Sequence, residues 1–186
     1  MKNILSFLLV AIIMGLVGCT NKKAGNTANM PTLSEETEAD STVYGKCGEG
    51  SAMHTLELIT DKGDTLVYAI NDDDSCSVVK GGLFAGDRLA VTGYKQEEGL
   101  VATQVINITS LLGKWVSLDK TFDLQEGGVV VSNVKEPKPY TEWKIQNGHL
   151  VLSSDTFDIY NLGPDSLYLE NAKGIYGYKR SVENNK

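Results

Sequence analysis

The chain has 186 residues, of which 41% are hydrophobic, and a formal net charge of −7 at pH 7. This acidic balance argues against nucleic acid as a partner, because such binding rests on cationic contacts to phosphates, and against a body that lies flat on anionic lipid. The length suits two small domains.

Residues 1–18 have the organisation of an export signal. Lys2 supplies a positive charge, and the apolar run over residues 4–17 is too short to cross a bilayer core, which takes about 17–25 residues. The run ends in Leu16-Val17-Gly18-Cys19, which resembles the lipobox of bacterial lipoproteins. The resemblance implies that residues 1–18 are a lipoprotein signal peptide and that Cys19 is acylated, with palmitate among its chains. An ordinary secretory signal with an incidental cysteine is the alternative.

The residues that follow Cys19 bear on location. Thr20 stands where an aspartate usually retains such lipoproteins in the inner membrane, and residues 20–24 lack the acidic pair of some surface-exported lipoproteins of the Bacteroidetes. By this resemblance we expect a protein anchored in the outer membrane that faces the periplasm. Residues 19–42 are polar and lack aromatic side chains, so we expect a flexible tether there.

Cys47 and Cys76 are the remaining cysteines. In an oxidising compartment they form a possible disulfide, which would stabilise the fold by roughly 3–4 kcal/mol in the chain-entropy model. Two buried free thiols are the alternative, and the geometry decides between them.

Residues 43–109 read as short strands separated by turn residues, and they predict a first domain. The strand-like segments are residues 43–47, 56–58, 66–70, 89–94 and 101–106. Five strands in this length fit a small Greek-key barrel of the OB type, and residues 81–89 resemble the approach to the fourth strand in bacterial OB-like domains.

Residues 110–182 predict a second domain, followed by a tail over residues 183–186. Its strand-like segments are residues 115–118, 121–124, 129–132, 141–145, 150–152, 156–161, 166–169 and 175–180. Eight short strands in order predict an up-and-down meander that closes into a barrel. No helix is predicted after the signal, so the expected class is all-β with two small antiparallel barrels.

The second domain carries a further resemblance. Leu112-Gly113-Lys114-Trp115 opens it and Lys179-Arg180 lies on its last strand, an arrangement similar to lipocalin-like families. The resemblance implies that Gly113 and Trp115 lie near the closed end of the barrel and that Arg180 packs across the indole, a contact worth roughly 0.5–2 kcal/mol. An OB-like and a lipocalin-like domain also occur, in the opposite order, in NlpE-like lipoproteins.

Aromatic residues of the second domain suggest a recognition surface. Tyr140, Trp143, Tyr176 and Tyr178 are a possible rim for a ligand or partner, and Tyr176, Tyr178 and Arg180 share one strand face by period two. The alternative is that these rings are sheet core and cross-strand pairs. Strands this short leave two possibilities open, an interior filled by side chains or a cavity for a small apolar molecule.

Residues typical of catalysis or metal binding are sparse. His54 and His149 have no neighbouring ligand pattern, and residues 71–75, with three aspartates, fit a turn better than a calcium loop. We expect no metal and no cofactor. We expect a non-enzymatic protein, and the alternative is an enzyme such as a hydrolase that uses an unidentified pair of carboxylates.

These features predict a membrane-anchored, non-enzymatic lipoprotein that binds or senses. Its expected partners are membrane lipid, through Cys19, and a small apolar ligand or an envelope protein. The alternative is a structural or assembly factor of the outer membrane, or an inhibitor of an envelope hydrolase, that acts through protein contacts.

Overall fold

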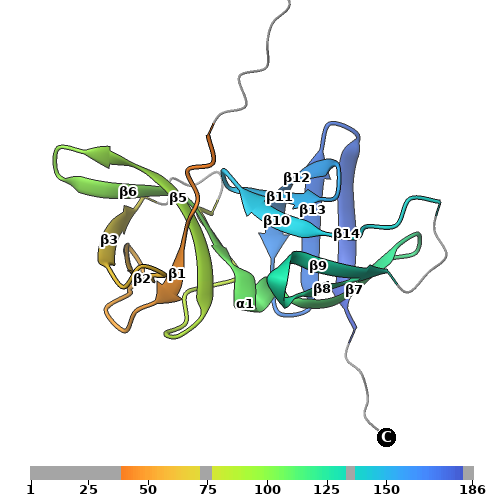
Figure 1. Ribbon diagram of the computed structural model, residues 1–186, viewed down its shortest axis with the longest axis horizontal. Helices are drawn as coiled ribbons and strands as arrows, with labels where there is room; N and C mark the ends of the chain where they lie inside the picture. The colour runs from red at the N-terminus through yellow and green to blue at the C-terminus, as the bar shows by residue number, and fades with distance from the viewer. Residues whose placement is uncertain (1–38, 72–76, 133–136, 182–186) are drawn as a thin grey trace, which may run out of the picture. The chain divides into compact units, whose positions relative to one another are not determined.

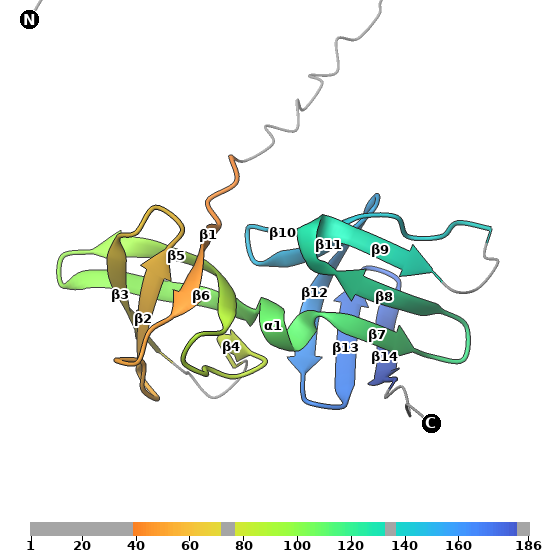
Figure 2. The same ribbon diagram turned by 60° about the horizontal axis from the view of Figure 1, so that its bottom comes forward.

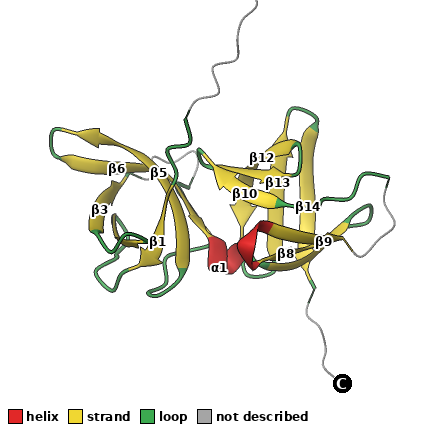
Figure 3. Ribbon diagram, viewed as in Figure 1, coloured by secondary structure: helices red, strands yellow, loops and turns green. Residues whose placement is uncertain are grey.

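The computed structural model describes residues 39–71, 77–132 and 137–181 (Figure 1). Within these ranges the chain forms two successive β-barrels and one four-residue α-helix, and Figure 3 shows how strands dominate the fold. The predicted all-β class with two small barrels is confirmed. The predicted signal peptide and most of the predicted tether fall outside the described residues.

The first barrel is one sheet with the strand order β3-β2-β1-β5-β6-β4. Its strands are β1 (Val43–Cys47), β2 (Thr55–Thr60), β3 (Thr65–Ile70), β4 (Val79–Lys80), β5 (Arg88–Gln96) and β6 (Gly99–Asn107). A parallel pairing of β3 with β6 closes the five longer strands into a barrel, in the order expected of an OB-like Greek key. The two-residue β4, parallel to β6, was not predicted.

Alternating burial along these strands builds the first core. In β2, Leu56 and Leu58 are fully buried, whereas Ile59 is exposed. At the start of β5, Leu89 and Val91 are fully buried as well, but Ala90 between them is also buried, so this segment does not alternate. Because successive side chains of a strand point to opposite faces, the alternation along β2 fixes which of its faces turns inward.

A short helix, α1 (Ile108–Leu111), follows β6 directly and corrects the expectation that no helix is present. Asn107 caps it, since its side-chain oxygen accepts a hydrogen bond from the Ser110 amide at 2.9 Å. A single turn is too short to show a helical repeat in the sequence, which is why the periodicity missed it.

The second barrel is an antiparallel meander of eight strands, as predicted. They are β7 (Gly113–Val116), β8 (Thr121–Gln125), β9 (Val129–Ser132), β10 (Trp143–Gln146), β11 (His149–Leu152), β12 (Asp155–Leu162), β13 (Ser166–Asn171) and β14 (Gly174–Arg180). The last strand pairs with the first, β14 with β7, and Figure 2 shows them side by side. The barrel is nearly closed, because β9 and β10 meet through one bridge, between Val129 and Glu142.

The strand bounds differ from the prediction at one place that matters for the site. The first strand was expected over residues 115–118, but β7 ends at Val116, and Leu118 lies in the turn that follows. The amide of Ser117 donates to the carbonyl of Lys120 at 2.8 Å and closes this turn. Leu118 is therefore at the tip of a hairpin instead of on a sheet face.

Candidate ligand-binding pocket

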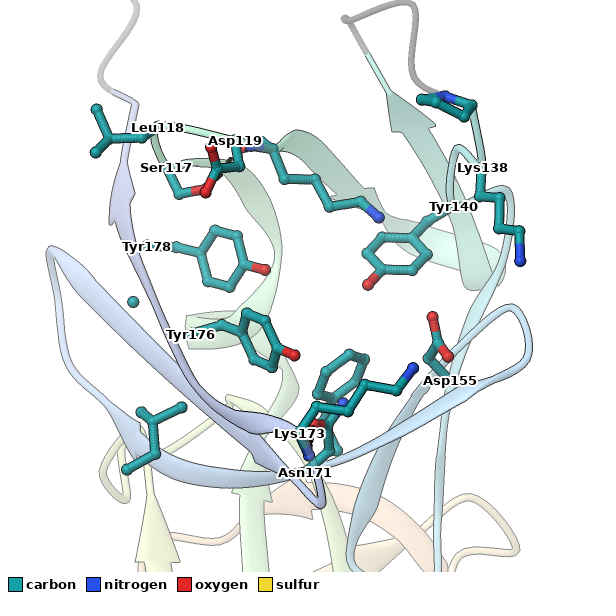
Figure 4. A pocket seen from close by; sticks show the side chains of 15 residues that line it. Ser117, Leu118, Asp119, Lys138, Tyr140, Asp155, Asn171, Lys173, Tyr176 and Tyr178 are labelled. Atoms are coloured by element: carbon teal, nitrogen blue, oxygen red, sulfur yellow. Dashed lines mark hydrogen bonds between the residues drawn. The ribbon is translucent and has the colours of Figure 1, made fainter.

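The two ends of the second barrel differ. At one end α1 leads into β7, and Trp115 is completely buried. At the opposite end the barrel opens into a pocket of about 650 Å³ (Figure 4). Its lining comes from the loops β7–β8, β9–β10 and β13–β14, from the start of β12, from the end of β13 and from β14. In an up-and-down barrel alternate loops lie at the same end, which is why segments far apart in sequence meet there.

Aromatic rings form the floor and one wall of the pocket. Phe122 packs edge-on against Tyr178, with ring centroids 5.0 Å apart, and against Tyr140 at 5.8 Å. Phe157 continues the cluster, 6.5 Å from Tyr140 and 5.9 Å from Tyr176. Edge-to-face packing at these distances holds the rings in fixed orientations. The pocket therefore has a rigid apolar base.

Polar groups surround this base. Figure 4 shows the hydroxyl groups of Tyr140, Tyr176 and Tyr178 pointing toward the middle of the opening. The charged residues that line the pocket are three lysines and two aspartates: Lys120, Lys138, Lys173, Asp119 and Asp155. Asp119 lies in the β7–β8 loop and Asp155 is the first residue of β12, and the two lie apart in Figure 4. An apolar base with a charged rim suits a molecule that has an apolar body and a polar end.

The position of Lys120 links the rim to the base. Its Nζ atom lies 3.5 Å from the centroid of the Tyr140 ring, within the range of a cation–π contact. Tyr140 itself is 7% exposed, so the ammonium group covers one face of an otherwise buried ring.

The opposite end is sealed by Arg180. Its guanidinium carbon lies 4.2 Å from the Trp115 ring centroid, and the group donates to the carbonyls of Leu112 at 2.7 Å and Pro164 at 2.6 Å and to that of Ser110. Burial lowers the pKa of Arg180 from its ordinary value. The Trp115 indole donates to the Leu111 carbonyl at 2.9 Å. Together the two side chains satisfy carbonyls of α1 and its C-cap that have no partner within the helix.

Gly113 is required at this end for two reasons. Its φ of 115° lies in the region that residues with a Cβ rarely adopt. A Cβ there would also lie 2.9 Å from Nη1 of Arg180. The three residues expected near the closed end, Gly113, Trp115 and Arg180, thus lie together in the structure.

The structure brings together three of the four aromatic residues predicted as a rim. Tyr140, Tyr176 and Tyr178 all line the pocket, but Trp143 does not. Its indole donates to the Gln125 carbonyl at 2.8 Å, beside the seam between β9 and β10. This bond gives Trp143 a structural role in the barrel wall, in place of the predicted position on the rim.

Sequence reasoning missed several residues of the pocket. Phe157, Leu118, Lys120 and Lys173 were not singled out, although they line it. The signal that could have found them is topological: in a meander of eight strands, every second loop lies at the same end. The hairpin tips after the first and seventh strands then predict Leu118 and Lys173 at one opening.

Other predicted sites remain predictions. Cys47 is buried, with its Sγ atom 3.3 Å from the Ser51 hydroxyl oxygen, and Cys76 and Cys19 lie outside the described residues, so the disulfide stays a prediction. Most of the acidic turn over residues 71–75 lies outside them as well. In the described ranges no group of three or more potential ligands could hold a metal ion, and His149 instead contacts Asp158 at 2.6 Å.

Comparison with known families supports part of this description. A family model described as lipocalin-like matches residues 107–181, which begin at the cap of α1 and extend one residue beyond β14. No curated protein and no solved structure matches the chain. Among the residues with a described structure, no helix is long and apolar enough to span a membrane.

Proposed function

We propose that this chain is a membrane-anchored binding protein whose second barrel holds a small molecule with an apolar body. The proposal is supported by the match of residues 107–181 to a lipocalin-like family, a fold typical of non-enzymatic proteins that bind small hydrophobic ligands. We further propose that the acylated Cys19 anchors it in the outer membrane, facing the periplasm. That part rests on the lipobox resemblance of residues 16–19 alone.

One observation carries the ligand-binding proposal, namely the aromatic pocket at the open end of the barrel. Its volume of about 650 Å³ falls within the range of about 300–1,000 Å³ typical of small-molecule sites. The opposite end is filled by Trp115 and Arg180, so the barrel offers a ligand one way in. The interior is thus packed at one end and hollow at the other.

Tyr176 provides a test that leaves the core intact. It is 36% exposed and lines the pocket, so its replacement removes a wall without opening a cavity in the buried cluster. We expect Tyr176→Ala to weaken binding of a polarity-sensitive apolar fluorophore about tenfold, equivalent to roughly 1.4 kcal/mol. Fluorescence titration of purified protein measures the dissociation constants.

A matched control lies on β13, the strand that pairs with β14. Tyr168 on β13 is 42% exposed and does not line the pocket. We expect Tyr168→Ala to bind the fluorophore as the parent does. The proposal is wrong if the parent binds no member of a panel of apolar fluorophores and fatty acids, or if the two variants lose affinity equally.

A further inference from the structure

The rim of the pocket carries a leucine that has no role in the fold. Leu118 is completely exposed at the tip of the β7–β8 turn. The turn is held by the Ser117 amide, by the Ser117 hydroxyl, which accepts from the Lys120 amide at 3.1 Å, and by no contact that needs a leucine. Turn tips generally carry Gly, Pro, Asn, Asp or Ser, which makes an exposed leucine here unusual.

A second hairpin tip at the same opening repeats this feature. Ile175 follows the β13–β14 turn and is 56% exposed, and Tyr176 beside it is also exposed. Both line the pocket together with Leu118. Single exposed apolar side chains are normal on a protein surface, but three around one opening indicate a contact surface.

The charge of this rim is opposite to that of the chain. Three lysines and two aspartates line the pocket, a net charge of +1, whereas the whole chain carries −7. Lys138 and Lys173 are both exposed, each on a loop at the opening. Asp119 lies next to Leu118, and Asp155 is the first residue of β12. Exposed leucine and aromatic side chains interspersed with lysine are typical of surfaces that enter a lipid interface.

We propose that the open end of the second barrel docks on a lipid surface that contains anionic headgroups. Leu118 and Ile175 enter the interface, and Lys138 and Lys173 contact headgroups. The acidic remainder of the chain is repelled by such a surface, so the docking is end-on, with the pocket mouth against the lipid. An apolar ligand then passes between membrane and pocket without crossing water.

The test uses a soluble chain that begins at Thr20 and therefore has no lipid anchor. This chain retains the compact unit Glu38–Lys186, which contains both barrels and their cores. Binding is measured by cosedimentation with vesicles of phosphatidylcholine mixed with phosphatidylglycerol, and with vesicles of phosphatidylcholine alone. We expect binding to the anionic vesicles and weaker binding to the neutral ones.

Two substitutions separate the apolar from the charged contribution. Leu118→Ser should lower partitioning onto anionic vesicles about tenfold, because burying a leucine side chain contributes this much. Lys173→Gln should lower it about fivefold on anionic vesicles and leave neutral vesicles unaffected. Val67→Ser is the matched control, since Val67 is 55% exposed on β3 of the first barrel, away from the pocket.

The proposal is overturned if the parent does not bind vesicles, or if Leu118→Ser and Val67→Ser bind them equally. It is also overturned if the parent forms a stoichiometric complex with an envelope protein that Leu118→Ser weakens, while the parent does not bind vesicles. The last would assign the rim to a protein partner. Failure here is distinguishable from failure of the proposed function. Fluorophore binding in the pocket without vesicle binding overturns only the docking surface, and the reverse overturns only the ligand site.

Discussion

At the scale of single residues, Arg180 does more than its position on the last strand suggests. Its guanidinium donates to three carbonyls, those of Ser110, Leu112 and Pro164, and stacks on the Trp115 ring. The planar guanidinium has five N–H donors and can satisfy acceptors in several directions at once. The three donors of a lysine ammonium all lie on one nitrogen and cannot reach the same set of carbonyls. One side chain therefore ties the end of the chain to the start of the barrel.

This role predicts a clear loss of stability. We expect Arg180→Met to lower the free energy of unfolding by about 2–3 kcal/mol, because carbonyls that accept from a charged donor lose it while the stem is retained. The free energy of unfolding of Arg180→Lys should lie between that of Arg180→Met and that of the parent. Urea denaturation followed by tryptophan fluorescence measures the change. Lys179→Met, on the exposed neighbouring residue, is the control, and equal midpoints for the two methionine variants would contradict the prediction.

At the scale of elements, α1 shows how a single buried side chain sets the junction between strands. Asn107 is fully buried at the end of β6 and caps the helix. Its amide nitrogen donates to the Asp87 carboxylate at 2.6 Å and to the Gly82 carbonyl at 3.1 Å. The strand expected over residues 101–106 ends just before Asn107, and the burial of this asparagine depends on the fold around it.

Replacing the buried cap residue Asn107 should therefore lower the free energy of unfolding more than replacing an exposed cap residue. We expect Asn107→Ala to lower the free energy of unfolding by about 2–4 kcal/mol, since the helix cap is lost and buried partners are left without a donor. Chemical denaturation is the measurement. Asn161→Ala on β12, where the side chain is exposed, should change stability by less than about 0.5 kcal/mol. Similar losses in the two variants would refute the special role of Asn107.

The strands show where local pattern is sufficient and where it fails. The alternation along β14 predicted that Tyr176, Tyr178 and Arg180 share a face, and Tyr178 and Arg180 each contact a different buried ring. The same reasoning placed Leu118 in a strand, because Leu118 lies two positions after Val116 and fits the alternation. The turn that ends β7 depends on backbone bonds to Lys120, which composition does not reveal.

At the scale of the whole molecule, the predicted anchor at Cys19 sets the location that we expect for the pocket. Cys19 lies outside the described residues, and the described part of the chain has no spanning helix. In the proposed function, membrane attachment rests on the predicted acylation of Cys19. Several acyl chains on one residue give an attachment that is effectively permanent.

Substitution of Cys19 tests the anchor directly. We expect Cys19→Ala to keep residues 1–18, to lose palmitate labelling, and to leave the outer-membrane fraction, because no acyl acceptor remains. Metabolic labelling and membrane fractionation are the measurements. Cys47→Ala is the control and should keep both the label and the location, since Cys47 is buried in the first barrel. Labelled Cys19→Ala protein would refute the lipobox interpretation.

The sequence by itself determined the all-β class and the succession of two barrels. These properties follow from the two-residue alternation of side chains along a strand and from turn residues between strands. Both signals involve only neighbouring residues in the chain, so the sequence shows them directly. Only the tertiary structure decided that Tyr140, Tyr176 and Tyr178 line one pocket while Trp143 lies apart from it. Tyr140 lies in the loop before β10, whereas Tyr176 and Tyr178 lie on β14, so four strands separate them in the sequence, and the closure of the barrel brings them to one opening.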